Sequence, residues 1–106
     1  MIITSTDEIE GMEIKKVLGL VRGNSVRARH IGRDITALFR NVVGGELPEY
    51  TRLMAESREV ATERMIGRAE ELGANAIVAT RFMTSAIMNG ASEILVYGTA
   101  VLVEDD

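Results

Sequence analysis

The chain has 106 residues, a formal net charge of −4 at pH 7 and no cysteine. A chain of this length forms one domain and buries roughly 60 to 70% of its unfolded surface, so its core can form without cross-links. The lack of cysteine excludes disulfides, thiolate nucleophiles, zinc–thiolate sites and iron–sulfur clusters. No apolar run reaches membrane-spanning length and no signal-peptide pattern is present, so we expect a soluble cytoplasmic protein with no membrane partner.

The charges are unevenly distributed along the chain. Residues 1–14 carry four acids, residues 15–40 carry seven basic residues against one acid, and residues 41–106 carry eleven acids against five arginines. A basic middle segment could attract an anion or a nucleic acid. The segment has no interleaved aromatic residues, which argues against nucleic acid. We favour arginines that face the acids of a long helix, within the chain or across a subunit boundary.

The first elements in chain order are short or apolar. Residues 2–4 predict a short strand, and residues 12–22 predict a strand that is apolar on both parities, so both of its faces should be covered. Glycine, asparagine and serine at residues 23–25 are typical of a turn. Apolar residues at spacings of three and four over residues 31–43 predict a short helix, which Gly44 and Gly45 end.

A long helix should follow from Pro48 to Leu72. Proline suits the first helical position because its missing N–H has no partner there anyway. Gly73 then stands where a left-handed C-terminal cap is needed, and an apolar run of strand character follows. The helix has one apolar stripe that should pack on a sheet. Its members are Tyr50, Leu53, Met54, Ser57, Val60, Ala61, Met65, Ala69 and Leu72.

Residues 76–88 and 92–103 predict two long strands joined by Asn89 and Gly90. Asn-Gly between two strand-like runs is a strong hairpin signal, because both central residues of the favoured turn need positive φ. A two-residue turn makes paired residue numbers sum to 179, whereas a longer loop such as residues 89–92 would shift the register. The two-residue turn pairs Phe82 with Tyr97, Met83 with Val96 and Thr80 with Thr99.

The second of these strands is apolar on both parities. Two helices can cover one face of the sheet, so the other face needs a different partner, and another copy of the chain is the simplest one. One parity holds Ile94, Val96, Ala100 and Leu102, and the other holds Leu95, Tyr97, Val101 and Val103. Phe82 and Tyr50 are predicted core residues.

The candidate site residues cluster around the single histidine. His30 and Asp34 have the four-residue spacing that places two metal ligands on one helix face. Arg27, Arg29 and Arg33 beside them are the best candidates for an anion site. No third metal ligand lies at a diagnostic interval, and we favour structural roles, in which His30 caps a helix and Asp34 pairs with an arginine.

No recognisable catalytic motif is present. The segment Gly44 to Pro48 lacks the Gly-Lys-Ser/Thr ending of a phosphate-binding loop and carries Glu46. The serines have no histidine at a recognisable spacing, and there is no Gly-x-Ser-x-Gly turn. An enzyme with an unrecognised carboxylate pair therefore has no positive support in the sequence, and we expect a protein that is not an enzyme.

Several short strings together resemble the YbjQ-like family of small bacterial and archaeal proteins. The resemblance lies in their order and spacing over residues 1–103, which leaves residues 104–106 as an acidic tail of a single domain. The strings are Gly19-Leu20-Val21-Arg22-Gly23, Arg33-Asp34, Val43-Gly44-Gly45, Tyr50, Leu72-Gly73-Ala74-Asn75-Ala76-Ile77-Val78 and Gly98-Thr99-Ala100-Val101.

The resemblance implies a dodecin-type α+β subunit that assembles as a ring, usually a pentamer. We therefore expect an antiparallel sheet with a short and a long helix on one face, in the order strand-strand-helix-helix-strand-strand. The family is functionally uncharacterised and carries a heavy-metal-binding label. A soft thiolate site cannot be built here, because the chain has no cysteine and one histidine. Arg33 and Asp34 match the family pattern.

The leading hypothesis is a non-enzymatic ring that serves as a small-ligand-binding or assembly module. The alternative is a metal ion or an anion bound at subunit interfaces around His30, Arg33 and Asp34, where symmetry would supply the missing ligands.

Overall fold

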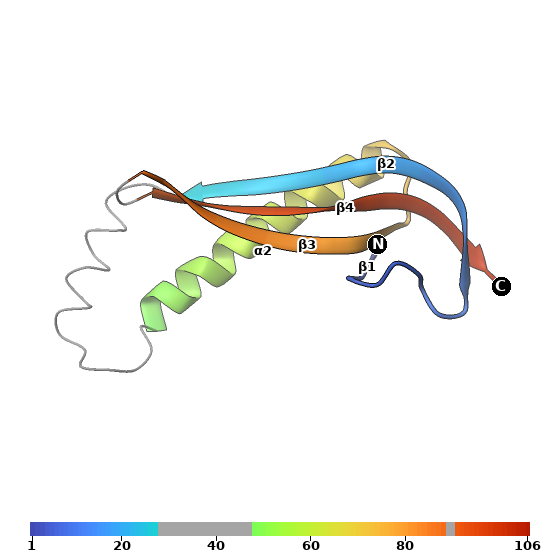
Figure 1. The fold of residues 1–106 in the computed structure, drawn as a ribbon, viewed down its shortest axis with the longest axis horizontal. Helices are drawn as coiled ribbons and strands as arrows, with labels where there is room; N and C mark the ends of the chain where they lie inside the picture. Colours follow the sequence, from blue (N-terminus) through green and yellow to red (C-terminus); the bar gives the residue numbers. More distant parts are fainter. Residues whose placement is uncertain (28–47, 89–90) are drawn as a thin grey trace.

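The computed structural model describes residues 1–27, 48–88 and 91–106 (Figure 1). Its elements are β1 (Ile2–Ile3), β2 (Met12–Arg27), α2 (Pro48–Glu71), β3 (Ala76–Met88) and β4 (Ala91–Asp105). The strands form one four-stranded sheet in the order β1-β3-β4-β2. The predicted short helix at residues 31–43 lies outside the described residues.

The sheet is mixed, so the prediction of a purely antiparallel sheet is wrong. β4 pairs antiparallel with β2 and with β3, but β1 pairs parallel with the start of β3. The N–H of Ile2 donates to the carbonyl of Asn75 at 3.2 Å, and the N–H of Thr4 donates to that of Ile77 at 3.0 Å. Parallel pairing is possible here because the whole of β2 and α2 separates the two strands in the sequence.

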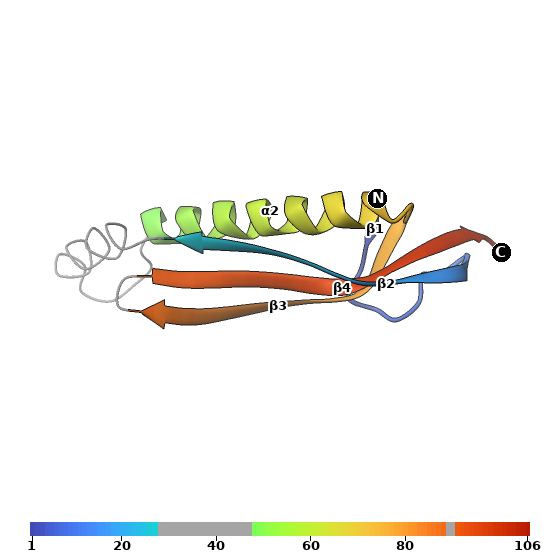
Figure 2. The ribbon, with the colours of Figure 1, turned by 90° about the horizontal axis from the view of Figure 1, so that it is seen from above.

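Helix α2 covers one face of the sheet and packs against β2 and β4 (Figure 2). The predicted stripe is confirmed at its centre, where Ser57, Ala61, Met65 and Ala69 are buried. Leu72 is 48% exposed, so its assignment to the buried stripe is wrong, because it lies beyond the last helical turn. The core under α2 contains Val21, Ala61, Met65, Ala69, Ile77, Ile94, Val96 and Ala100.

The C-terminus of α2 has the predicted glycine cap. Gly73 has φ +85°, which is the left-handed conformation that glycine adopts without strain. The N–H of Gly73 donates to the carbonyl of Glu70 at 3.0 Å, and that of Ala74 donates to Ala69 at 3.1 Å. These two bonds are those of a Schellman motif, and they satisfy carbonyls that the end of a helix leaves without partners.

β2 runs without interruption through residues 23–25, so the turn predicted there is wrong. Gly23 faces α2, and a Cβ atom there would lie 2.5 Å from the backbone nitrogen of Met65 and even closer to the carbonyl oxygen of Ala61. Asn24 donates from Nδ2 to Oε2 of Glu93 on β4 at 2.9 Å. Glycine therefore allows the helix to approach the strand closely, and asparagine bonds across the sheet.

The hairpin register agrees with the prediction only at its tip. Met88 pairs with Ala91, and the numbers of these two residues have the predicted sum of 179. An irregularity between Ala86 and Met88 then shifts the register, so the predicted pairs further along are wrong. A second shift follows between Val78 and Arg81, where Ala79 has φ +54°. The observed pairs include Arg81 with Tyr97, Phe82 with Val96, Met83 with Leu95 and Val78 with Thr99.

Part of the second apolar parity of β4 is covered by the chain itself. Val101 and Val103 are buried in a second cluster with Ala76 and Val78 of β3. Partly buried residues near the N-terminus pack against this cluster, namely Ile9, Met12 and Ile14. Val101 and Val103 are therefore covered within the chain and do not need the second copy that was expected for this parity.

Other apolar residues remain exposed in the single chain. Val17 and Leu20 of β2 are 65% and 68% exposed, contrary to the prediction that both faces of this strand are covered. Phe82 of β3 is 52% exposed, so its assignment to the core is also wrong. Phe82 pairs with Val96, which faces α2, but α2 lies on the β2 side of the sheet and away from β3 (Figure 2).

We expect Gly73→Val to lower the free energy of unfolding by about 1 kcal/mol or more, because a Cβ residue would be held at positive φ. No atom lies within 4 Å of the added Cβ, so the effect would come from the backbone alone. Gly67→Ala is the control, because this helical glycine also has open space around it and alanine should stabilise α2. Urea unfolding of both variants measures the difference, and an unchanged Gly73→Val midpoint would contradict the prediction.

Candidate functional site

The residues predicted for metal and anion binding lie at or beyond the end of β2. Arg27 is the last residue of that strand, and its backbone pairs with Ser92 of β4. Arg29, His30, Arg33 and Asp34 lie outside the described residues. The predicted site therefore stays a prediction, and the described residues offer other candidates.

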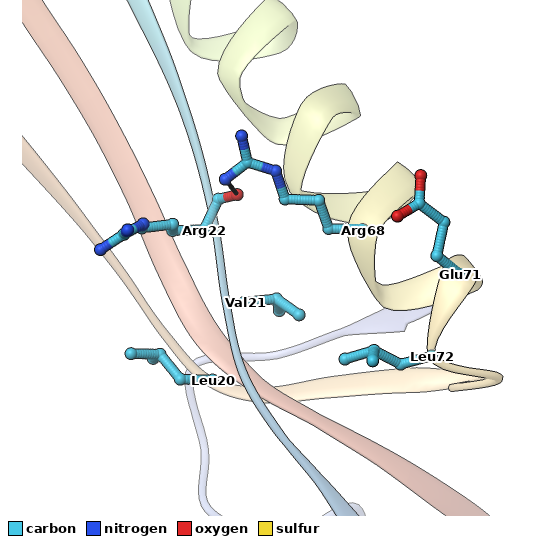
Figure 3. Close-up of a pocket in the computed structure, with 6 residues that line it drawn as sticks. All are labelled: Leu20, Val21, Arg22, Arg68, Glu71 and Leu72. Atoms are coloured by element: carbon cyan, nitrogen blue, oxygen red, sulfur yellow. Dashed lines mark hydrogen bonds between the residues drawn. The ribbon is translucent and has the colours of Figure 1, made fainter.

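The first candidate is a pocket between β2 and the C-terminal turn of α2 (Figure 3). Its volume is about 380 Å³, and it combines exposed leucine side chains with charged ones. Arg68 donates from Nη1 to the backbone carbonyl of Arg22 at 2.8 Å, which joins the helix to the strand across the pocket. The lining residues are Leu20, Val21, Arg22, Arg68, Glu71 and Leu72.

A second arginine repeats this contact one helical turn earlier. Arg64 donates from Nη1 to the carbonyl of Asn24 at 2.7 Å, two residues along β2 from the carbonyl that Arg68 binds. Carbonyls two residues apart point to the same side of a strand. The carbonyls of Arg22 and Asn24 point away from β4 and toward α2, since arginine side chains of that helix donate hydrogen bonds to them. The two arginines thus occupy carbonyls on the free edge of β2, where a further strand could otherwise pair.

Neither arginine is among the site residues predicted from the sequence. Their signal is the four-residue spacing of Arg64 and Arg68, which places them on one side of α2. That spacing alone does not show that the side chains bind backbone carbonyls, because the distance between α2 and β2 depends on the packing at Gly23.

The sheet face opposite α2 is the second candidate, and we call its uncovered part the open face. Val21, Gly23 and Val96 face the helix, so their neighbours along each strand face the other way. Tyr97 and Leu95 on this face are half-buried. The open face comprises Leu20, Arg22, Asn24 and Val26 of β2, Arg81, Met83 and Ser85 of β3, and Glu93, Leu95, Tyr97 and Thr99 of β4.

The favoured pairing of the basic segment stays a prediction, because Arg29, Arg33 and Arg40 lie outside the described residues. Among the described members of the basic segment, Lys15 forms an ion pair with Glu13 at 3.0 Å, within β2 and not with the long helix. Both side chains are about half exposed, so this pair contributes little to stability. For Arg22, no ion pair with a described residue is found.

The architecture defines an α+β protein with a four-stranded mixed sheet and one described helix. A crystal structure of a protein of unknown function from Pediococcus pentosaceus, assigned to the DUF74 family, has the same fold. Its TM-score is 0.65 at 18% identity, and the match covers 98% of each chain.

Sequence comparison then identifies the family. The chain belongs to the YbjQ family, whose description reads "Putative heavy-metal-binding", and the match covers residues 1–104. A UPF0145 protein of Clostridioides difficile is 52% identical over 100% of this chain and 95% of the relative. A UPF0145 protein of Thermosipho melanesiensis is 57% identical over 95% of this chain and 94% of the relative.

The described residues do not fit a heavy-metal site. In residues 1–27, 48–88 and 91–106 no group of three or more histidine, aspartate or glutamate side chains could hold a metal ion. Cysteine is absent from the whole chain, so thiolate, the preferred ligand of soft metals, cannot contribute.

Among the described residues, no helix is both long enough and apolar enough to cross a membrane.

Replacing Arg64 and Arg68 with methionine should expose the edge of β2 to other strands. We expect the free energy of unfolding of the double variant to fall by less than about 1 kcal/mol for each replaced arginine, because the contacts are solvent-exposed. Its concentration-dependent association should rise, because two edge carbonyls lose their donors. Light scattering across a dilution series measures this, with Arg58→Met on exposed helix surface as the control. Equal scattering by both variants would contradict the protective role of the two arginines.

Proposed function

We propose that this protein is a non-enzymatic homo-oligomer, a ring of five subunits, that serves as a small-ligand-binding or assembly module in the cytoplasm. The observation that carries the proposal is the open face. Three of its apolar members, Leu20, Val26 and Met83, are each more than half exposed in the single chain. Soluble chains rarely leave such a set uncovered on one continuous surface.

The position of α2 is the physical reason for this exposure. A single described helix packs on one side of the sheet and covers β2 and β4. The N-terminal residues cover the far end of the other side through Ile9, Met12 and Ile14. The remaining surface carries apolar side chains on three strands, interspersed with the charged Arg22, Arg81 and Glu93, and a partner that covers it would bury these apolar groups. A second copy is always available at equal concentration, which supports self-association.

The alternative function is metal or anion binding where subunits meet. The family description supports it, and a site built from symmetry-related copies would need few ligands from each chain. His30 and Asp34 would then be the metal ligands, and Arg27, Arg29 and Arg33 would attract an anion. A metal ion is thus the one cofactor that this alternative requires.

Size-exclusion chromatography with light scattering tests the assembly. At micromolar concentration we expect an oligomer, and the proposed ring predicts that it has five subunits. We expect Leu20→Lys to dissociate it, because the new charge would be buried at the interface. Leu20 is already 68% exposed in the single chain, so the variant should still fold. Glu59→Lys on the exposed side of α2 is the matched control. A stable wild-type monomer would refute the proposal.

Metal analysis of the purified protein tests the alternative. We expect any bound divalent metal to fall at least severalfold in His30→Ala, because the chain's single imidazole is lost. The protein would be incubated with zinc, desalted and analysed by mass spectrometry, with Lys16→Ala as the control. An equal zinc content in both variants would show that His30 is not a zinc ligand.

A further inference from the structure

The outer edge of β3 carries a stretch of backbone without a partner strand, from Phe82 to Ala86, which we call the free edge. Further back on β3, the N–H of Thr80 donates to the carbonyl of Thr4 at 3.0 Å, so this N–H points away from β4. Backbone groups two residues apart point to the same side of a strand, so those of Phe82, Thr84 and Ala86 also point outward. No described residue pairs with these outward groups.

The free edge is regular, uncharged and exposed on both faces of the sheet. Residues 81–87 are all exposed, because β3 lies on the side of the sheet away from α2 (Figure 2). Phe82 on the helix side is 52% exposed, and Met83 on the opposite side is 55% exposed. The register with β4 is unbroken from Arg81 to Ala86. A regular, partly apolar edge without charged residues is a template on which another strand can pair.

The other described edges of the sheet are protected against pairing. On β2, two arginines of α2 occupy outward carbonyls, and two register shifts between Ile14 and Gly19 interrupt the first half of the strand. The start of β3 is covered by the N-terminal segment, which also holds Arg81 through a 2.8 Å bond from Nη1 to the carbonyl of Ser5. β1 has only two residues, and so short an edge pairs poorly. In the part of the chain that the structure describes, the free edge is the regular edge that remains open.

We propose that the free edge pairs with the free edge of a second copy, antiparallel and about a two-fold axis at Thr84. The protected edges identify this occupant, because a second copy offers the same stretch as its own open edge. Two identical stretches overlap fully only when they are centred on their middle residue. Thr84 then lies opposite Thr84, and Phe82 lies opposite Ala86. Threonine pairs are favourable across antiparallel strands, and no like charges oppose each other in this register.

This contact is separate from the open face and goes beyond the proposed function. A two-fold contact uses the same surface on both copies, so it cannot close a ring of five subunits. It can join two such rings, or two single chains if no ring forms. The paired stretch is short, and small contacts are weak, so the pairing should form at higher concentration than the ring does.

Oxidative cross-linking of the full chain tests the pairing, because the chain has no cysteine of its own. Thr84→Cys would place two thiols across the axis with Cα atoms about 5.5 Å apart, a separation that a disulfide can span. We expect Thr84→Cys to form a disulfide-linked dimer at least roughly tenfold faster than Arg58→Cys on exposed helix surface, because pairing raises the effective thiol concentration. Non-reducing electrophoresis over time measures both rates. Equal rates for the two variants would overturn the inference.

Light scattering from micromolar concentration to about 0.5 mM measures the association itself. We expect the wild-type mass to double over this range. Thr84→Lys should abolish the doubling, because two like charges would face each other across the axis, and Thr84 is exposed in the single chain, so the variant should fold. Ala55→Lys adds the same charge on exposed helix surface and should double as the wild type does.

The masses separate this inference from the ring. A doubling from five to ten subunits supports both. A doubling from one to two subunits supports edge pairing and refutes the ring, whereas a mass that stays at five subunits supports the ring and overturns edge pairing. A doubling that persists in Thr84→Lys would also overturn the inference, because the association would then use another surface.

Discussion

The close contact between α2 and β2 at Gly23 determines where the rest of the structure lies. A side chain at this position would collide with the backbone of the helix near Ala61 and Met65. Because the contact is between backbones, α2 is held over β2 and the adjacent part of β4. Buried alanine and serine residues on this side of the helix, such as Ala69 and Ser57, permit the same short distance. The helix therefore cannot also cover β3.

This placement explains three features of the surface of the molecule. On the helix side, Phe82 of β3 is left half exposed although it pairs with the buried Val96. At the edge, Arg64 and Arg68 are close enough to donate to carbonyls of β2. On the opposite side, nothing in the described chain covers the open face beyond the cluster of Val101 and Val103. Self-association is proposed for that remaining surface.

The local signals at the two ends of α2 were accurate, unlike the turn signal at residues 23–25. Pro48 begins α2 and Gly73 ends it with positive φ, because each residue restricts or permits a backbone conformation by its own structure. The register at Met88 and Ala91 likewise follows from the two residues between them. The pairs beyond it could not be predicted, because the irregularities near Ala86 and Ala79 shift the register. Of the candidate site, the sequence suggested residues near His30, whereas the arginines on α2 and the open face emerged only from the structure.

The sequence by itself determined the class of the protein, the ends of its long helix, its hairpin and its family membership. These follow from residue spacing, from turn-forming residues and from similarity along the whole chain. The tertiary structure alone decided that Gly23 is a packing contact and not a turn, and that Arg22 and Arg81 both pair with Tyr97 across the sheet. The reason is that such features depend on strand register and on the distance between layers, which residues far apart in the chain set together.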